Sequence, residues 1–249
     1  MFSITSRQLG ALSELAFLKY QQGLLARMRK HFPRLAKYLG PQDAHQLVQH
    51  ACDVAEQHGF ETERDICSYT DLIIMLGVGF DSDPQLEWGA AVLGDPTPMG
   101  PGTRMDELWD QAAIYMDKTL GPDEICLKRA FVMDRRRRQS SGKAFATREE
   151  LLIDYFREIW PAKTEYIGMA ALRSLITEST KAAKGYWITD SEGQTEFAIH
   201  AFLFGHMFHI DPRYLNVNKA LKSGQSSHSY ASIPQVVAAF DEYANQVLL

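Results

Sequence analysis

The sequence predicts an all-α protein made of two tandem copies of a helical bundle unit, related by an internal duplication. When the chain is compared with itself at an offset of 128 residues and without gaps, 18 of the 121 overlapping positions are identical. Unrelated sequences of average composition would share roughly 7. The matches are mainly Gly, Pro, aromatic residues and Leu, which shape backbone and core, whereas charged positions mostly differ. No stretch shows the sustained two-residue alternation of a half-buried strand.

We expect one helical unit at residues 1–121 and another at 143–249, with a basic linker helix at 122–142 between them. Each unit is long enough to bury apolar side chains. The equivalent residues that should fix the backbone occur in pairs 128 apart, and these are Pro33 and Pro161, Gly40 and Gly168, Gly77 and Gly205, Asp83 and Asp211, Pro84 and Pro212.

The first expected helix is long and runs to about His31, because the residue before Pro33 avoids the helical region. A short turn of helix then ends at Gly40, where glycine can adopt the left-handed conformation that stops a helix. The second helix covers about 43–57 and ends near Gly59.

The third helix opens at Thr62-x-x-Asp65, a capping pattern. Asp83-Pro84 opens a fourth, because Asp accepts from the free amides and Pro suits the first helical position. A fifth covers 104–120. The second unit should repeat this order, with helices to Trp160, near 170–184 and 195–205, from Asp211, and over 234–248.

Composition excludes several classes of protein. The net charge of −5 favours neither nucleic acid nor an anionic membrane. No apolar run approaches the roughly 18 residues that a membrane span needs, and no secretory signal is visible at the N-terminus. Cys52, Cys67 and Cys126 are odd in number and unrelated in spacing, which argues against a disulfide framework. We therefore expect a cytoplasmic protein.

One segment carries a recognisable pattern in the first half: Glu63-Arg64-Asp65-Ile66, Tyr69, Asp71-Leu72, Gly77-x-Gly79-Phe80-Asp81-x-Asp83-Pro84 and Trp88. Together with Phe32-Pro33 and Gly40 it resembles an uncharacterised helical domain of small proteins encoded beside bacterial type VI secretion genes. The resemblance covers about residues 9–93. The second half keeps the Trp-Pro, Gly and Asp-Pro positions, but residues 191–194 replace the acidic and basic segment.

The resemblance implies a role in handling effectors or in protecting the producing cell, because such proteins are encoded near the secretion spike, its tip protein and their toxic effectors. We therefore expect a non-enzymatic protein-binding module that acts as an adaptor, chaperone or immunity protein. The expected partner is a spike component or a toxic effector, and no cofactor is expected.

The densest charge on the chain is the run Arg135, Arg136, Arg137 and Arg138. Each arginine offers a planar fork that can bind two carboxylate oxygens, so this run is the candidate binding site for an acidic protein partner. The competing interpretation is a solvated linker helix. An acidic chain disfavours nucleic acid as the partner.

A competing function is a metal-dependent enzyme that uses His200, His206 and His209 in the second half, with Asp211 nearby. Imidazole and carboxylate groups at these spacings could bind zinc or iron. However, helix capping already explains Asp211, and His206 and His209 flank a helix end. No catalytic residue and no metal ligand is therefore assigned.

The large aromatic residues are predicted to lie in the core, although some could form an exposed patch for a partner. They include Trp88, Trp109, Trp160 and Trp187.

Overall fold

The computed structural model describes residues 6–94, 101–140, 149–227 and 232–249, and within these ranges it contains helices and no strand, which confirms the predicted all-α class. The elements are α1 (Ser6–His31), α2 (Pro33–Gln57), α3 (Glu63–Leu76), η1 (Pro84–Leu86), α4 (Glu87–Gly94), α5 (Pro101–Leu120), η2 (Pro122–Glu124), α6 (Ile125–Ser140), α7 (Glu149–Ile159), α8 (Pro161–Gly185), α9 (Ser191–Phe204), η3 (Pro212–Tyr214), α10 (Leu215–Ser227), α11 (Ser232–Tyr243) and η4 (Ala244–Leu248).

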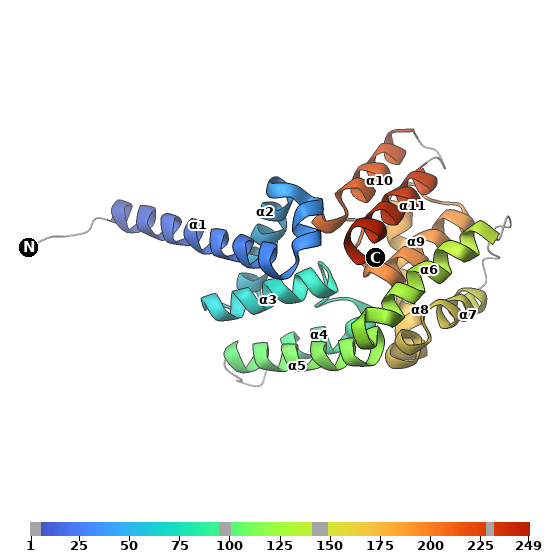
Figure 1. Cartoon of the computed structure of the whole chain (residues 1–249), viewed down its shortest axis with the longest axis horizontal. Coiled ribbons are helices and arrows are strands. Elements are labelled where there is room, and N and C mark those ends of the chain that lie inside the picture. The colour runs from blue at the N-terminus through green and yellow to red at the C-terminus, as the bar shows by residue number, and fades with distance from the viewer. Residues whose placement is uncertain (1–5, 95–100, 141–148, 228–231) are drawn as a thin grey trace, which may run out of the picture.

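Helices α1 to α5 lie in one half of the molecule and α7 to α11 in the other (Figure 1). Helix α1 projects away from the body, whereas the C-terminus lies near the centre of the view. None of the helices in the described ranges is long and apolar enough to cross a membrane. Cys52 is buried, and Cys67 and Cys126 are partly buried, each as a free thiol.

The predicted helix breaks occur where proline and glycine require them. Helix α1 ends at His31, and α2 begins at Pro33. Gly40 has a φ of 71° and produces a kink inside α2, and Gly168 does the same inside α8 with a φ of 77°. The non-helical backbone at Gly40 therefore ends a short first helix within α2, as the sequence predicts, and a longer helix follows.

Three predicted caps are confirmed. The Thr62 side chain accepts a hydrogen bond from the Asp65 amide at 3.1 Å. The Asp83 carboxylate accepts from the Gln85 amide at 2.9 Å, and Asp211 accepts from the Arg213 amide at 2.8 Å. Both aspartates begin a single 3₁₀ turn, η1 or η3, that leads into α4 or α10.

One continuous hydrophobic core runs through both halves. Helix α2 contacts η3, and α8 contacts η1, so each half packs against the turn of the other. The ring of Tyr38 meets Tyr243 edge-on at 5.4 Å between centroids, and Tyr166 meets Tyr115 in the same manner at 5.5 Å. The residues of these two pairs are 128 positions apart, and aromatic pairs in this arrangement stabilise packing beyond their buried area.

The segment predicted as a linker helix packs as part of the fold. Helix α6 lies against α5 and α7 and buries Ala130, Phe131 and Asp134. In its described part, α6 is therefore more than a solvated helix, because a helix with a buried face contributes to the core.

Candidate functional site

Two aspartates join the halves at their centre. Besides capping its own turn, Asp83 accepts a hydrogen bond from the His206 amide at 2.9 Å. Asp211 accepts from the Val78 amide at 3.0 Å. Val78 and His206 are themselves 128 residues apart, so the two bonds are equivalent and run in opposite directions across the junction. The neighbouring His206 ring and the hydrogen bonds from the Gln85 and His206 amides hold the pKa of Asp83 below its usual range despite its burial.

The side chains two positions after each aspartate also form hydrogen bonds across the junction. Gln85 donates to the Ala201 carbonyl at 3.0 Å, and Arg213 donates to the Ile74 carbonyl at 3.0 Å. Arg213 is 4% exposed and also forms an ion pair with Asp211 at 2.7 Å. Its guanidinium is therefore a structural cation whose charge is neutralised by Asp211.

Gly77 is required by this arrangement. Its φ is 112°, and a Cβ atom there would lie 2.5 Å from a guanidinium nitrogen of Arg213. Gly205 has a φ of 99° at the equivalent position. Glycine allows both the left-handed backbone and the close approach of the opposite half.

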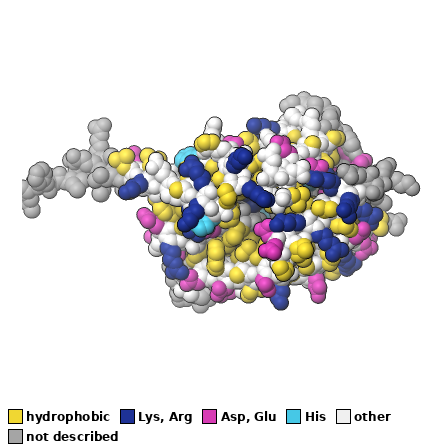
Figure 2. Space-filling view, in the orientation of Figure 1, with side chains coloured by type: hydrophobic (Ala, Val, Ile, Leu, Met, Phe, Trp, Pro, Cys, Tyr) yellow, Lys and Arg dark blue, Asp and Glu magenta, His cyan; other side chains and the backbone are white. Residues whose placement is uncertain are grey.

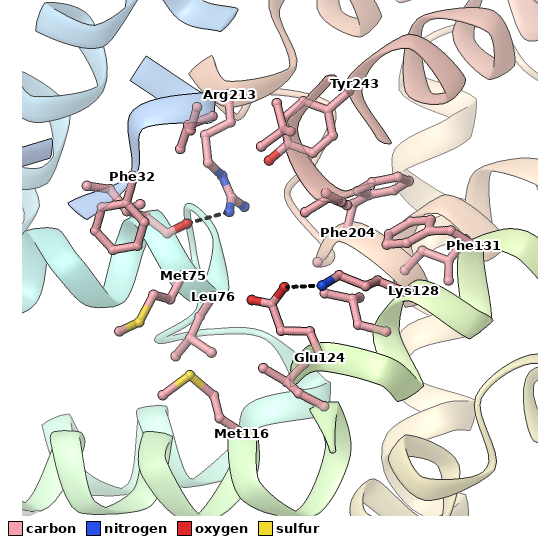
Figure 3. Close-up of a pocket in the computed structure, with 18 of the residues that line it drawn as sticks. Phe32, Met75, Leu76, Met116, Glu124, Lys128, Phe131, Phe204, Arg213 and Tyr243 are labelled. Atoms are coloured by element: carbon pink, nitrogen blue, oxygen red, sulfur yellow. Dashed lines mark hydrogen bonds and ion pairs between the residues drawn. The ribbon is translucent and has the colours of Figure 1, made fainter. Parts of the chain in front are cut away.

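A pocket of about 580 Å³ opens at the junction (Figure 3). Most of its wall is apolar. Figure 2 shows apolar side chains gathered on the visible face between α3 and α5, with basic and acidic side chains around them. Sixteen lining residues form eight pairs 128 positions apart, and these are Phe32 and Trp160, Leu35 and Lys163, Met75 and Leu203, Leu76 and Phe204, Gln85 and Arg213, Leu86 and Tyr214, Tyr115 and Tyr243, Leu120 and Leu248.

The lysine in this wall is unusual. Lys163 is 3% exposed, and its ammonium donates to the Phe202 carbonyl. The ammonium lies 4.7 Å from the ring centre of Trp160 and 4.8 Å from that of Phe202. Among the described residues, no carboxylate forms an ion pair with it. Burial lowers the pKa of Lys163 to about 8, although the charge of Asp83 acts in the opposite direction.

A second lysine lines the pocket in a different environment. Lys128 of α6 forms an ion pair with Glu124 at 3.6 Å, and its side chain is 39% exposed. Figure 3 shows this pair on one side of the pocket and Arg213 on another. The charge of Lys128 is therefore solvated and paired, in contrast to that of Lys163.

Internal ion pairs involve three of the residues proposed for partner binding, Arg135, Arg137 and Arg138. Arg135 contacts Asp241 at 3.3 Å, and Arg137 contacts Glu158. The Arg138 side chain is 16% exposed and pairs with Asp134 and Asp241. These contacts fix α6 to α7 and α11. Arg136 is exposed on α6.

Arg138 belongs to a buried polar cluster beneath α6. Asp134 accepts a hydrogen bond from Tyr155 at 2.7 Å. Burial raises the pKa of Glu196 to about 7 and lowers that of His200 to about 3, and the charge of Arg138 further lowers the pKa of His200. Desolvation thus favours the neutral form of both groups.

The three histidines considered as metal ligands have separate surroundings. His200 is buried, donates a hydrogen bond from Nδ1 to the Glu196 carbonyl at 2.7 Å, and stacks on Phe240. His206 lies beside Asp83, and His209 beside Tyr186. Within the described residues, no group of three or more His, Cys, Asp or Glu side chains could hold a metal ion.

The contact of His209 has a counterpart in the first half. His209 meets the hydroxyl of Tyr186 at 3.2 Å, and the residues 128 positions earlier, Asp81 and His58, pair at 2.6 Å. The same two turns are thus joined in each half by different side chains. Burial lowers the pKa of His209 to about 4, so the ring is neutral at pH 7.

The turn after α8 carries an exposed tryptophan. Trp187 is 60% exposed and has a φ of 61°, although the sequence predicted it in the core. The residue 128 positions earlier is Gly59, with a φ of 77°. A left-handed conformation suits glycine and strains a bulky residue. Ile210 is 51% exposed in the neighbouring turn, and the adjacent residues Tyr186 and His209 are hydrogen bonded.

Sequence reasoning missed Lys163 and the exposure of Trp187. A signal for both exists in the comparison at offset 128, where Lys163 replaces Leu35 and Trp187 replaces Gly59. No protein-family model, curated protein or solved structure matches this chain.

Proposed function

We propose that this chain is a non-enzymatic protein-binding module, and that it consists of two copies of one helical unit produced by duplication. The reciprocal bonds of Asp83 and Asp211 support the duplication, as do the reciprocal tyrosine pairs. Such exchange of equivalent contacts is typical of two like units packed about a two-fold axis. In this account the units share one junction and differ in their surfaces.

The binding function rests on the exposure and the backbone conformation of Trp187. The left-handed backbone of Trp187 adds strain of about 1–2 kcal/mol to the folded state. Its side chain is 60% exposed and therefore contributes little to the core. The fold itself can accept glycine at such a turn, as Gly59 does. Tryptophan is enriched among the residues that dominate protein–protein binding energy. Trp187 is therefore the proposed anchor for a partner protein, with exposed Ile210 in the turn that His209 joins to Tyr186.

The resemblance to proteins encoded beside type VI secretion genes supports an adaptor, chaperone or immunity role in the cytoplasm, with a spike component or a toxic effector as partner. A contribution from Arg135 to Arg138 stays a prediction. Arg136 and Arg137 occupy the exposed face of α6, where additional contacts with acidic groups would weaken as salt screens them.

Co-purification tests this function. The chain is co-expressed with the protein encoded by each adjacent gene, and a complex is isolated through a tag on the chain. Trp187→Gly should reduce the yield of the partner at least tenfold, whereas Trp109→Ala, which alters another exposed tryptophan on α5, should leave it unchanged. Equal loss in both variants, or retention in both, would exclude Trp187 as the anchor.

A further inference from the structure

We propose that the junction pocket binds a ligand with one carboxylate and an apolar body, and that Lys163 binds the carboxylate. This site is separate from the Trp187 turn, so it makes a second binding function for the chain. The pocket combines a buried ammonium that has no ion-pair partner among the described residues, an apolar wall, and a volume suited to a small organic ligand.

The charge of Lys163 has no carboxylate at ion-pair distance among the described residues, although Asp83 acts on it from further away. A lysine ammonium has three N–H donors, and the described residues offer this one a single carbonyl oxygen, that of Phe202. The faces of Trp160 and Phe202 attract the cation but accept no strong hydrogen bond. A buried charge without a carboxylate partner destabilises a fold, so its presence in a pocket wall points to a ligand that supplies the negative charge.

The position itself does not need a charge for folding. Leu35 lines the same pocket 128 residues earlier and is 5% exposed. An apolar side chain therefore fits the equivalent place in the other half. Arg213 is not available to bind the carboxylate of a ligand, because Asp211 already neutralises its charge. The Ile74 carbonyl also accepts a hydrogen bond from its guanidinium.

The rest of the wall selects an apolar body. Met75, Leu76, Leu203 and Phe204 are among the lining side chains. The volume of about 580 Å³ lies within the range of pockets that enclose small organic ligands. A carboxylate at Lys163 with an alkyl chain or apolar side chains against these residues would satisfy both features of the wall.

Two sources supply this chemistry: a free medium-chain fatty acid, and the C-terminal carboxylate of a peptide that ends in apolar residues. Calorimetric titration of the purified full chain distinguishes them. One arm uses decanoate with decanol as the uncharged match. The other uses acetyl-Ala-Val-Leu-Leu with a free carboxylate and the same peptide as its amide.

We expect at least one carboxylate to bind, its uncharged match to bind at least tenfold more weakly, and Lys163→Leu and Lys163→Met each to abolish that preference. Lys128→Met is the matched control, because Lys128 lines the same pocket but is paired with Glu124, and it should change the affinity less than threefold. Binding of decanoate alone assigns a fatty acid, and binding of the peptide alone assigns a chain terminus.

The proposal is overturned if neither carboxylate binds, if decanol and the amide bind as tightly as the acids, or if both Lys163 variants retain the preference while circular dichroism shows them folded. Capture of a partner through Trp187 is unaffected by any of these results, so the failure of one proposal is distinguishable from that of the other.

Discussion

Asp83 and Asp211 exchange equivalent hydrogen bonds across the junction of the two halves. Each carboxylate caps the turn that it begins and also binds an amide of the opposite half, at 2.9 Å for His206 and 3.0 Å for Val78. Both side chains are buried. The helix cap and the joint between the halves therefore depend on the same two residues, and we expect the halves to unfold in one cooperative transition.

Replacing either aspartate should destabilise the protein more than the loss of a simple cap. Asp83→Ala should lower the free energy of unfolding by about 2–4 kcal/mol, because the partly buried His206 amide also loses its acceptor. Asp211→Ala should lower it by about 3–5 kcal/mol, because Arg213 is then a buried cation without its partner. Urea denaturation measures both values.

Asp154→Ala is the matched control for these variants, because Asp154 forms an exposed i,i+3 pair with Arg157. Its effect should stay below about 0.5 kcal/mol. Effects of Asp83→Ala and Asp211→Ala as small as that of the control would show that the bonds across the junction add nothing to stability.

The arginines of α6 should differ sharply from one another. Arg138→Met should lower the free energy of unfolding by about 2–4 kcal/mol, because Asp134 is 1% exposed and loses its cationic partner. Arg137→Met should have little effect, because its pair with Glu158 is exposed. Thermal melts of the two variants at the same salt concentration test this order, and an Arg137 variant less stable than the Arg138 variant would contradict it.

Lys163→Leu should stabilise the protein at pH 7 by roughly 1–3 kcal/mol, because it removes a buried charge that no described carboxylate pairs. The folded pKa of about 8 lies below the ordinary lysine value of about 10.4, so the unfolded state binds more protons between these pH values. The wild-type free energy of unfolding therefore increases as the pH rises from about 8 to about 10.4, because Lys163 loses its buried charge there.

The advantage of the Leu variant should therefore be largest below pH 8 and should shrink towards pH 10. Denaturation of both proteins at pH 7 and pH 10 measures the difference, and comparison of the two cancels the contributions of the tyrosines and cysteines. A difference that is constant or grows with pH would show that Lys163 is not held as a destabilised cation.

The sequence predicts the local structure well because short-range chemistry determines it. Pro33, Gly40 and Thr62 act on their own turn, and the chain breaks, kinks or caps there in the structure. The hydrogen bond between Asp83 and the His206 amide could not be predicted in this way. No spacing in the sequence indicates which distant amide meets the carboxylate oxygen that is not used for the cap. The charge density at Arg135 to Arg138 likewise does not identify the acidic residues of α7 and α11 that pair with it.

The candidate sites were harder to predict because their residues differ from those 128 positions earlier. Lys163 and Trp187 differ in type from Leu35 and Gly59, and a search for identities passes over them. Only their surroundings give these differences meaning: an apolar pocket around the lysine, and a left-handed turn open to solvent around the tryptophan.

The proposed role of Trp187 is in binding and not in folding, and two properties of Trp187→Gly measured together test this role most directly. The free energy of unfolding should stay within about 1 kcal/mol of wild type or rise, because glycine adopts a φ near 61° without strain. The dissociation constant for the co-purified partner should rise at least tenfold in calorimetric titration, as expected for a binding anchor. A variant that loses several kcal/mol of stability and binds the partner as tightly as wild type would contradict the account.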